Sequence, residues 1–252
     1  MVVIMTIVEI KDLNYSFKNK ILFEHLDLSI KQNTITTILG ANGSGKSTLA
    51  NLIFKKYSGI IVNTKDIRMI TTNPEEQIIG KTVEEQLMFY LKQIIYDEKR
   101  IITNVNEIKK EFLSDELMMK DPFYLSLEYK QLVVALSNII CCPELLIFDD
   151  ALSFVRPYYK DKIFKYLKKK KITVLNFTNN TLESLYGNYI VILNKEVVLN
   201  KTLKWALKEE NIFLNNNIEM PFIANLSNKL KYYGLVDNTM LKMDEMVDRI
   251  WN

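Results

Sequence analysis

The sequence predicts an α/β fold with a mainly parallel core sheet. The apolar, β-branched run 34–39 leads through a glycine-rich turn into a helical pattern, as a strand, a loop and a helix do in succession. Residues 145–148 form a second apolar run, which follows a helical segment and ends in two aspartates. Two further strands are predicted at 173–177 and 189–193. Strands that alternate with helices in this way build a parallel sheet covered by helices.

An antiparallel layer is predicted ahead of this core. The alternating segments 7–10 and 26–30 flank a polar turn at 18–20, as the two strands of a hairpin do. Residues 1–8 are apolar, but they are few and lack both a basic leader and a small-residue cleavage site. We therefore expect a strand there rather than a signal peptide. Residues 60–72 are also strand-like.

Helices are predicted in the middle and at the end of the chain. Apolar residues recur at helical spacing over 83–91, 105–119 and 130–142. Strand patterns stop near residue 202, after which Pro221 suits the first position of a helix. A last helix is predicted over 243–250. The chain is thus expected to end in a small helical extension.

The composition is that of an ordinary globular protein, with 48% hydrophobic and 25% charged residues. A net charge of +3 is too small to indicate nucleic-acid binding, and the basic run 168–171 is expected to end a helix. No apolar run reaches the roughly 18 residues that a membrane crossing needs, so a membrane role would come through a partner. The sequence contains no metal-ligand cluster. Cys141 and Cys142, adjacent in an apolar stretch, predict buried, reduced thiols in the cytosol.

Residues 40–48, Gly-Ala-Asn-Gly-Ser-Gly-Lys-Ser-Thr, predict a phosphate-binding loop. Its glycines at 40, 43 and 45 allow positive φ and close backbone approach, so successive N–H groups can surround a phosphate at the helix N-terminus. Lys46 adds a charge for the β- and γ-phosphates, and the Ser47 hydroxyl is a natural Mg²⁺ ligand. A turn without function would not explain this offset of Lys and Ser. The residues predicted to bind nucleotide here are Asn42, Gly43, Ser44, Gly45, Lys46, Ser47 and Thr48.

The two aspartates that end the second apolar run, Asp149 and Asp150, form the arrangement known as Walker B when a phosphate loop precedes them. Asp149 is expected to reach Mg²⁺ through a water molecule. Asp150 is expected to orient the attacking water as a base. Together with the loop, the aspartates predict a nucleoside triphosphate and Mg²⁺ as cofactors.

Residues 124–131, Tyr-Leu-Ser-Leu-Glu-Tyr-Lys-Gln, open the helix that leads to these aspartates. Here the chain resembles ATP-binding cassette (ABC) ATPases, whose signature begins Leu-Ser and continues Gly-Gly-Gln. Phe17 matches the aromatic residue that stacks on adenine in that family, although an aromatic pair such as Tyr15 and Phe17 is more often core. Residues 73–77 lie just after the family's Q-loop position, and 151–157 occupy the place of its D-loop.

Residues 73–85 and 221–234 are similar to segments of the ATPase subunits of energy-coupling-factor (ECF) transporters, the micronutrient importers. The resemblance implies a P-loop NTPase fold with an ABC-type antiparallel layer and a helical subdomain at about residues 76–130. It implies an ATP-binding domain over 1–204 and a small C-terminal helical extension over 205–252.

In such a family two subunits hold two ATP molecules and Mg²⁺ between them, and Ser126 of one chain would meet the nucleotide of the other. The implied partners are a second ATPase subunit and a transmembrane coupling subunit, with a substrate-binding membrane subunit left open. No nucleic acid is implied. The resemblance places the protein peripherally at the cytoplasmic face of the cell membrane.

Three departures fall on the expected catalytic groups. Thr72 stands where the family has the Q-loop glutamine, and its shorter side chain should couple Mg²⁺ and the attacking water less well. Asp150 replaces the catalytic glutamate, which withdraws the carboxylate by about 1.5 Å from a water it must approach within about 3 Å. Asn179 replaces the switch histidine and cannot titrate. The chain's one histidine, His25, is far upstream and is expected to be structural.

The signature and the D-loop depart as well. Leu127 and Glu128 replace the signature glycines, Tyr129 replaces the glutamine, and Arg156 reverses the charge of the D-loop aspartate. A carboxylate beside a γ-phosphate would repel it unless turned away. A homodimer would carry every defect twice, so we expect weak intrinsic hydrolysis and an unlike partner subunit. The alternative is a non-hydrolysing structural or regulatory subunit. A soluble cassette protein of DNA repair or translation fits less well, because the sequence shows neither a second cassette nor long coiled coils.

Overall fold

The computed structural model describes residues 5–18 and 20–251, the side chain of residue 251 excepted. The chain divides into two compact units. The first unit contains the chain up to Asn63 and from Asn176 onward, and the second unit contains Thr64–Leu175. Strand β7 (Thr173–Thr178) runs from the second into the first.

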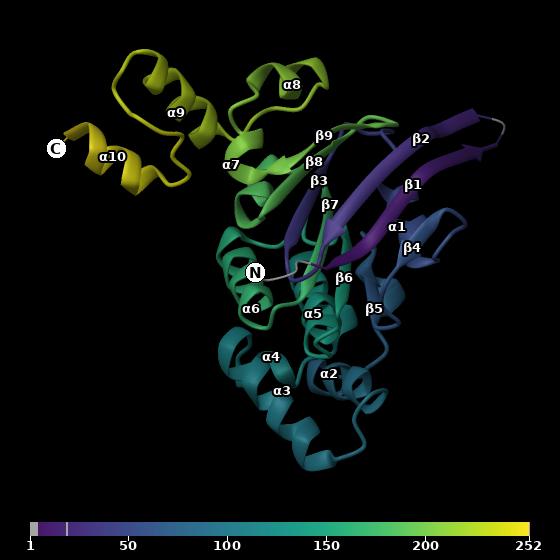
Figure 1. Ribbon diagram of the computed structural model, residues 1–252. Helices are drawn as coiled ribbons and strands as arrows, with labels where there is room; N and C mark the ends of the chain where they lie inside the picture. The colour runs from purple at the N-terminus through teal and green to yellow at the C-terminus, as the bar shows by residue number, and fades with distance from the viewer. Residues whose placement is uncertain (1–4, 19, 252) are drawn as a thin grey trace. The chain divides into compact units, whose positions relative to one another are not determined.

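The first unit begins with an antiparallel sheet, drawn in purple and blue in Figure 1. Its strands are β1 (Thr6–Phe17), β2 (Lys20–Lys31) and β4 (Ile60–Val62), in the order β2-β1-β4. The hairpin predicted from the alternating segments is confirmed, with Val8 opposite Ile30 and Ile10 opposite Leu28. Position 19 of the predicted turn and residues 1–4 of the predicted N-terminal strand lie outside the described residues.

The core strands of the first unit are β3 (Ile35–Leu39), β8 (Tyr189–Leu193) and β9 (Val197–Thr202). β3 pairs in parallel with β8, with Ile38 opposite Val191, and β8 pairs antiparallel with β9. Every residue of β3 is buried, which explains its continuous run of apolar and threonine residues. β3 leads through the glycine-rich loop into α1 (Lys46–Phe54), as predicted.

The C-terminal helices pack on the same core. They are α7 (Leu203–Ala206), α8 (Glu210–Asn215) and α9 (Phe222–Tyr232). The last helix, α10 (Met243–Trp251), follows α9 in the chain, and the short helix η3 (Thr181–Tyr186) precedes β8. One apolar cluster joins Leu39 and Ile192 to Phe213, Met220 and Ala224. Pro221 caps α9 and does not occupy its first turn, one position before the place predicted for it.

The second unit pairs two parallel strands and carries the middle helices. β5 (Ile67–Ile70) lies beside β6 (Leu145–Asp149), with Ile70 opposite Phe148. The helices are η1 (Pro74–Gln77), α2 (Val83–Lys92), α3 (Glu98–Phe112), α4 (Asp115–Met118), η2 (Pro122–Tyr124), α5 (Leu127–Ile139) and α6 (Pro157–Lys169). The basic run 168–171 ends α6, as predicted. In the part of the chain that the structure describes, no helix combines the length and the apolar character that a bilayer crossing requires.

Two predicted elements are divided in the structure. The strand-like stretch 60–72 holds two strands, β4 and β5, because a polar turn separates them and Thr64 accepts a hydrogen bond from the Asp66 amide at 3.0 Å. The helix predicted over 105–119 breaks after Phe112, where Ser114 caps α4 by accepting from the Leu117 amide at 3.2 Å.

The prediction of two buried thiols is correct for Cys141 and wrong for Cys142. Cys141 is buried in the turn that follows α5, and burial raises the pKa of its thiol to about 11. Cys142, the next residue, has a φ of 49° and is exposed. Both cysteines are free.

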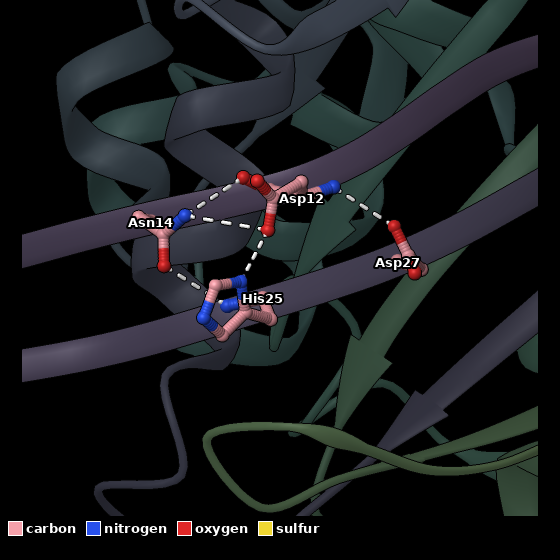
Figure 2. A network of polar contacts seen from close by, with 4 residues as sticks. All are labelled: Asp12, Asn14, His25 and Asp27. Atoms are coloured by element: carbon pink, nitrogen blue, oxygen red, sulfur yellow. Dashed lines mark hydrogen bonds and ion pairs between the residues drawn. The ribbon is translucent and has the colours of Figure 1, made fainter.

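His25 lies exposed on β2 in a polar network with β1 (Figure 2). Its Nδ1 contacts Asp12 Oδ1, and its amide donates to Asn14 Oδ1 at 3.0 Å. The Asp12 amide donates to Asp27 Oδ1 at 2.8 Å. Asp12 and His25 have φ values of 52° and 50°, so these side-chain contacts accompany a local irregularity in the hairpin. A structural role for His25 is consistent with these contacts.

We expect the imidazole of His25 to titrate above its ordinary pKa, because the hydrogen bond and the charge of Asp12 favour the protonated form. The stabilisation from this pair is present below the unfolded-state pKa and is lost as the pH rises through the folded-state pKa. The sequence has one histidine, so a proton NMR titration reads this group alone. Asp12→Asn should lower the His25 pKa, whereas Glu9→Gln on the same strand should not. A His25 pKa unaffected by Asp12→Asn would contradict the assignment.

Candidate nucleotide site

The glycines of the loop 40–48 meet two different requirements. Gly43 and Gly45 have φ values of 82° and 101°, in the left-handed region that favours glycine, as predicted. Gly40 does not have a positive φ, and close approach is what requires glycine there. A Cβ on Gly40 would lie 2.4 Å from Ser44 Oγ and 2.5 Å from the Leu193 carbonyl oxygen. Close packing therefore demands glycine at position 40.

The N-terminus of α1 faces this loop with its amides. The first N–H groups of a helix have no acceptor within the helix, and no described side chain caps α1. The hydroxyl of Ser44 is buried without a hydrogen-bond partner among the described residues. A buried orphan hydroxyl beside uncapped amides suits an anionic ligand that accepts hydrogen bonds.

Lys46 lies within the loop, with 7% of its surface exposed. Its Nζ donates to the Gly40 carbonyl at 2.7 Å and to the Ala41 carbonyl at 3.1 Å. These contacts hold the ammonium group against the loop backbone. Ser47 is exposed and Thr48 is half-buried on the same helical turn.

The structure brings Asn179 to the loop. Its Nδ2 donates to Asn42 Oδ1 at 2.6 Å, and both residues are exposed. Asn179 directly follows β7, at the position predicted for the switch residue. A cavity of about 960 Å³ opens beside this pair, lined by residues 40–42, residues 179–182 and parts of the C-terminal helices. The first unit thus offers a recess next to the loop.

In the second unit, the structure brings Thr72 to the Walker B aspartates. Asp149 is buried at the end of β6, and the Thr72 hydroxyl donates to its carbonyl oxygen at 2.9 Å. Asp150 is half-buried with a φ of 50°, a conformation that is uncommon for a residue other than glycine. Such strained residues occur at functional sites.

Ser126 caps α5 by position, and it is exposed without a side-chain capping bond among the described residues. Gln131, buried in the same helix, accepts from the Phe154 amide at 2.9 Å and donates to Ser153 Oγ at 3.2 Å. Sequence reasoning missed this tie between the signature helix and the loop 151–156. The available signal was a glutamine within an apolar helix, because such a side chain needs hydrogen-bond partners when it is buried.

Sequence reasoning also treated Glu128 and Arg156 as separate departures, whereas the structure pairs them. Arg156 Nε and its backbone amide donate to Glu128 Oε1. The available signal for this pairing was that Glu128 and Arg156 carry opposite charges at two positions where the family has other residues. Phe17, predicted to stack on adenine, is 57% exposed on β1, so its ring is accessible.

The described residues contain no group of three or more His, Cys, Asp or Glu side chains that could hold a metal ion.

Comparison with known proteins agrees with this geometry. Residues 23–153 match the model of the ABC transporter family. The chain is 31% identical to the energy-coupling factor transporter ATP-binding protein EcfA1 of Mycoplasmopsis synoviae, over 90% of this chain and 91% of that protein. It is 28% identical to EcfA of Pediococcus pentosaceus, over 95% of this chain and 94% of that protein.

Solved structures show the same fold. The structure of cbiO1 from Clostridium perfringens, part of the ABC transporter complex cbiONQ, has a TM-score of 0.71 at 22% identity and covers 88% of this chain and 98% of its own. The ATP-binding cassette MJ0796 has a TM-score of 0.65 at 19% identity, over 78% of this chain and 98% of its own. The α/β fold with an antiparallel layer, a mainly parallel core sheet and a helical subdomain is confirmed. The chain belongs to the ABC transporter ATPases and resembles the ATP-binding subunits of energy-coupling factor transporters.

Proposed function

We propose that this chain is the ATP-binding subunit of an ECF-type importer, which binds MgATP at a composite interface with a second ATPase subunit. The phosphate loop carries the proposal, because Lys46, the uncapped start of α1 and the orphan hydroxyl of Ser44 converge on one anion site. Similarity to EcfA proteins over nearly the whole chain supports the subfamily.

Each predicted residue has a task in this proposal. Phe17 stacks on the base, residues 42–48 bind the phosphates, and Ser126 serves the partner's nucleotide. Mg²⁺, when bound, neutralises phosphate charge. Ser47, Asp149 and Thr72 would hold it.

We propose that hydrolysis at this chain's own site is weak. The Thr72 hydroxyl is engaged by the Asp149 carbonyl, and a threonine lacks the reach of a glutamine. Asp150 carries its carboxylate one methylene short of a glutamate. Asn179 donates its amide to Asn42 and cannot accept a proton as an imidazole does. Each loss of a positioned base costs about 10²- to 10⁴-fold in rate, and such losses are not additive.

Such a subunit acts through partners. We propose an unlike ATPase subunit that carries most of the hydrolysis, a transmembrane coupling subunit and a substrate-binding membrane subunit, with the chain peripheral at the cytoplasmic face of the membrane. Exposed apolar residues of the helical subdomain, Ile79, Phe89, Ile94 and Tyr96, support docking to a membrane subunit. We also propose that the chain comprises an ATP-binding domain over 1–204 and a small C-terminal helical extension over 205–252.

The proposal is tested by purifying the chain from its own cells with whatever ATPase and membrane subunits accompany it. We expect MgATP binding by the free chain and hydrolysis by the assembled complex. Binding without turnover in the assembled complex would favour the alternative, a structural or regulatory nucleotide-binding subunit. No MgATP binding at millimolar concentration would contradict both.

The three catalytic positions at which this chain departs from its family give a second prediction. Restoring the family's residues together, with Thr72→Gln, Asp150→Glu and Asn179→His, should raise hydrolysis by the assembled complex about 10- to 100-fold. Steady-state phosphate release measures the gain. Asn179→Gln in place of Asn179→His is the matched control, since it keeps the amide and adds only length. An unchanged rate in the triple variant would refute our account of these positions.

A further inference from the structure

Two departures from the family's pattern lie against each other in the second unit. Glu128 is in the first turn of α5, and Arg156 immediately precedes α6. Arg156 donates to Glu128 Oε1 both from its Nε and from its backbone amide, the latter at 3.4 Å. Two residues with charges foreign to their positions therefore form one ion pair.

Aromatic side chains hold the guanidinium on its other sides. Arg156 Nη2 donates to the Tyr129 hydroxyl at 3.2 Å. The guanidinium carbon lies 5.9 Å from the centroid of the Tyr129 ring and 5.6 Å from that of Tyr159, within cation–π range. The contact with Glu128 raises the pKa of Arg156, which keeps its charge at any physiological pH.

The carboxylate is the more enclosed member of the pair, with 21% of the Glu128 side chain exposed against 58% for Arg156. Glu128 is two residues after Ser126, at the helix end that the proposed function assigns to the partner's triphosphate. An unpaired carboxylate there would repel such an anion, and we expect this repulsion to cost about tenfold in binding.

We propose that Arg156 is a positioning residue that neutralises Glu128 and holds its carboxylate at the start of α6, so that the diverged signature still accepts a triphosphate bound by the partner ATPase subunit. This inference rests on the proposed function. On this inference, the positive charge of Arg156 in the D-loop compensates the negative charge of Glu128. The signature can therefore carry a glutamate and still bind an anion.

The test is MgATP-dependent assembly of this chain with the ATPase subunit that copurifies with it, followed by sedimentation velocity. Four variants are compared: Arg156→Ala, Glu128→Gln, the double variant of both, and Lys165→Ala. The last is the matched control, because Lys165 is on α6, the helix that Arg156 precedes, and forms an exposed ion pair with Asp161 at 2.6 Å. Urea unfolding without nucleotide verifies folding, and Arg156→Gln replaces Arg156→Ala if the latter does not fold.

We expect Arg156→Ala to weaken assembly about tenfold and the double variant to recover most of that loss. Glu128→Gln alone and Lys165→Ala should assemble no more weakly than the unmodified chain. If Glu128→Gln weakened assembly as much as Arg156→Ala, without recovery in the double variant, the pair would only fix the loop and the inference would be overturned. An Arg156→Ala variant that assembles normally would also overturn it. Failure of the unmodified chain to assemble would instead contradict the proposed function itself.

Discussion

Lys46→Ala is expected to lower the affinity of the chain for MgATP about 100-fold. The Lys46 ammonium is nearly buried and is held 2.7 Å from the Gly40 carbonyl, within the loop that would surround the phosphates. Removing one partner of a buried charged contact costs about 2–5 kcal/mol, and each 1.4 kcal/mol is tenfold in affinity. Isothermal titration calorimetry of the free chain with MgATP measures the loss directly.

Lys55→Ala is the matched control for this prediction. Lys55 is the C-cap of the same helix, at the end away from the loop, and it is exposed. This variant removes one lysine from α1 without touching the anion site, so its affinity should stay within about twofold of the unmodified chain. Similar losses for both lysines would point to non-specific charge attraction and against a specific role for Lys46.

Gly45→Ala is expected to lower the free energy of unfolding by about 2–5 kcal/mol. A φ of 101° costs an alanine about 1–2 kcal/mol in backbone strain. Its Cβ would also lie 2.7 Å from two ring carbons of Phe23, which is 1% exposed and packed in the core. Overpacking of this kind costs a further 1–3 kcal/mol, roughly. Urea unfolding of the nucleotide-free chain gives the number.

Gly43→Ala separates the cost of backbone strain from the cost of overpacking. Gly43 has a similar φ of 82°, but a Cβ there would have no atom within 4 Å. We expect it to show only the backbone strain, about 1–2 kcal/mol. Equal destabilisation by the two variants would show that Phe23 moves aside without cost, contrary to the close packing described above.

The parts of the structure that follow from local sequence were predicted well. The strand, loop and helix over 34–54 were predicted because glycine spacing and a continuous apolar run constrain the backbone over a few residues. Positive φ at Gly43 and Gly45 followed from the same local rule. At Gly40 the requirement is close approach to Ser44 and to Leu193, and the second of these partners lies far along the chain, where a local pattern does not identify it.

The contacts within the candidate site could not be predicted in this way. Asn42 meets Asn179 across 137 positions, and Thr72 meets Asp149 across 77. Such pairings depend on how whole strands align, which a local pattern does not encode. Glu128 and Arg156 are closer, at 28 positions apart, but their pairing depends on where α5 and the loop before α6 come together. The roles of these residues in binding and hydrolysis stay predictions.

The apolar cluster that joins Leu39 to Phe213, Met220 and Ala224 bears on experiments with shortened chains. Leu39 is the residue immediately before the phosphate loop, and Phe213, on α8, is fully buried. A chain ending at residue 204 would expose this cluster to water. It would also lose the side chains that pack against β3, the strand that leads into the phosphate loop. Residues 205–252 therefore support the strand that leads into the nucleotide site. Activities measured on chains that lack them would be those of a destabilised domain.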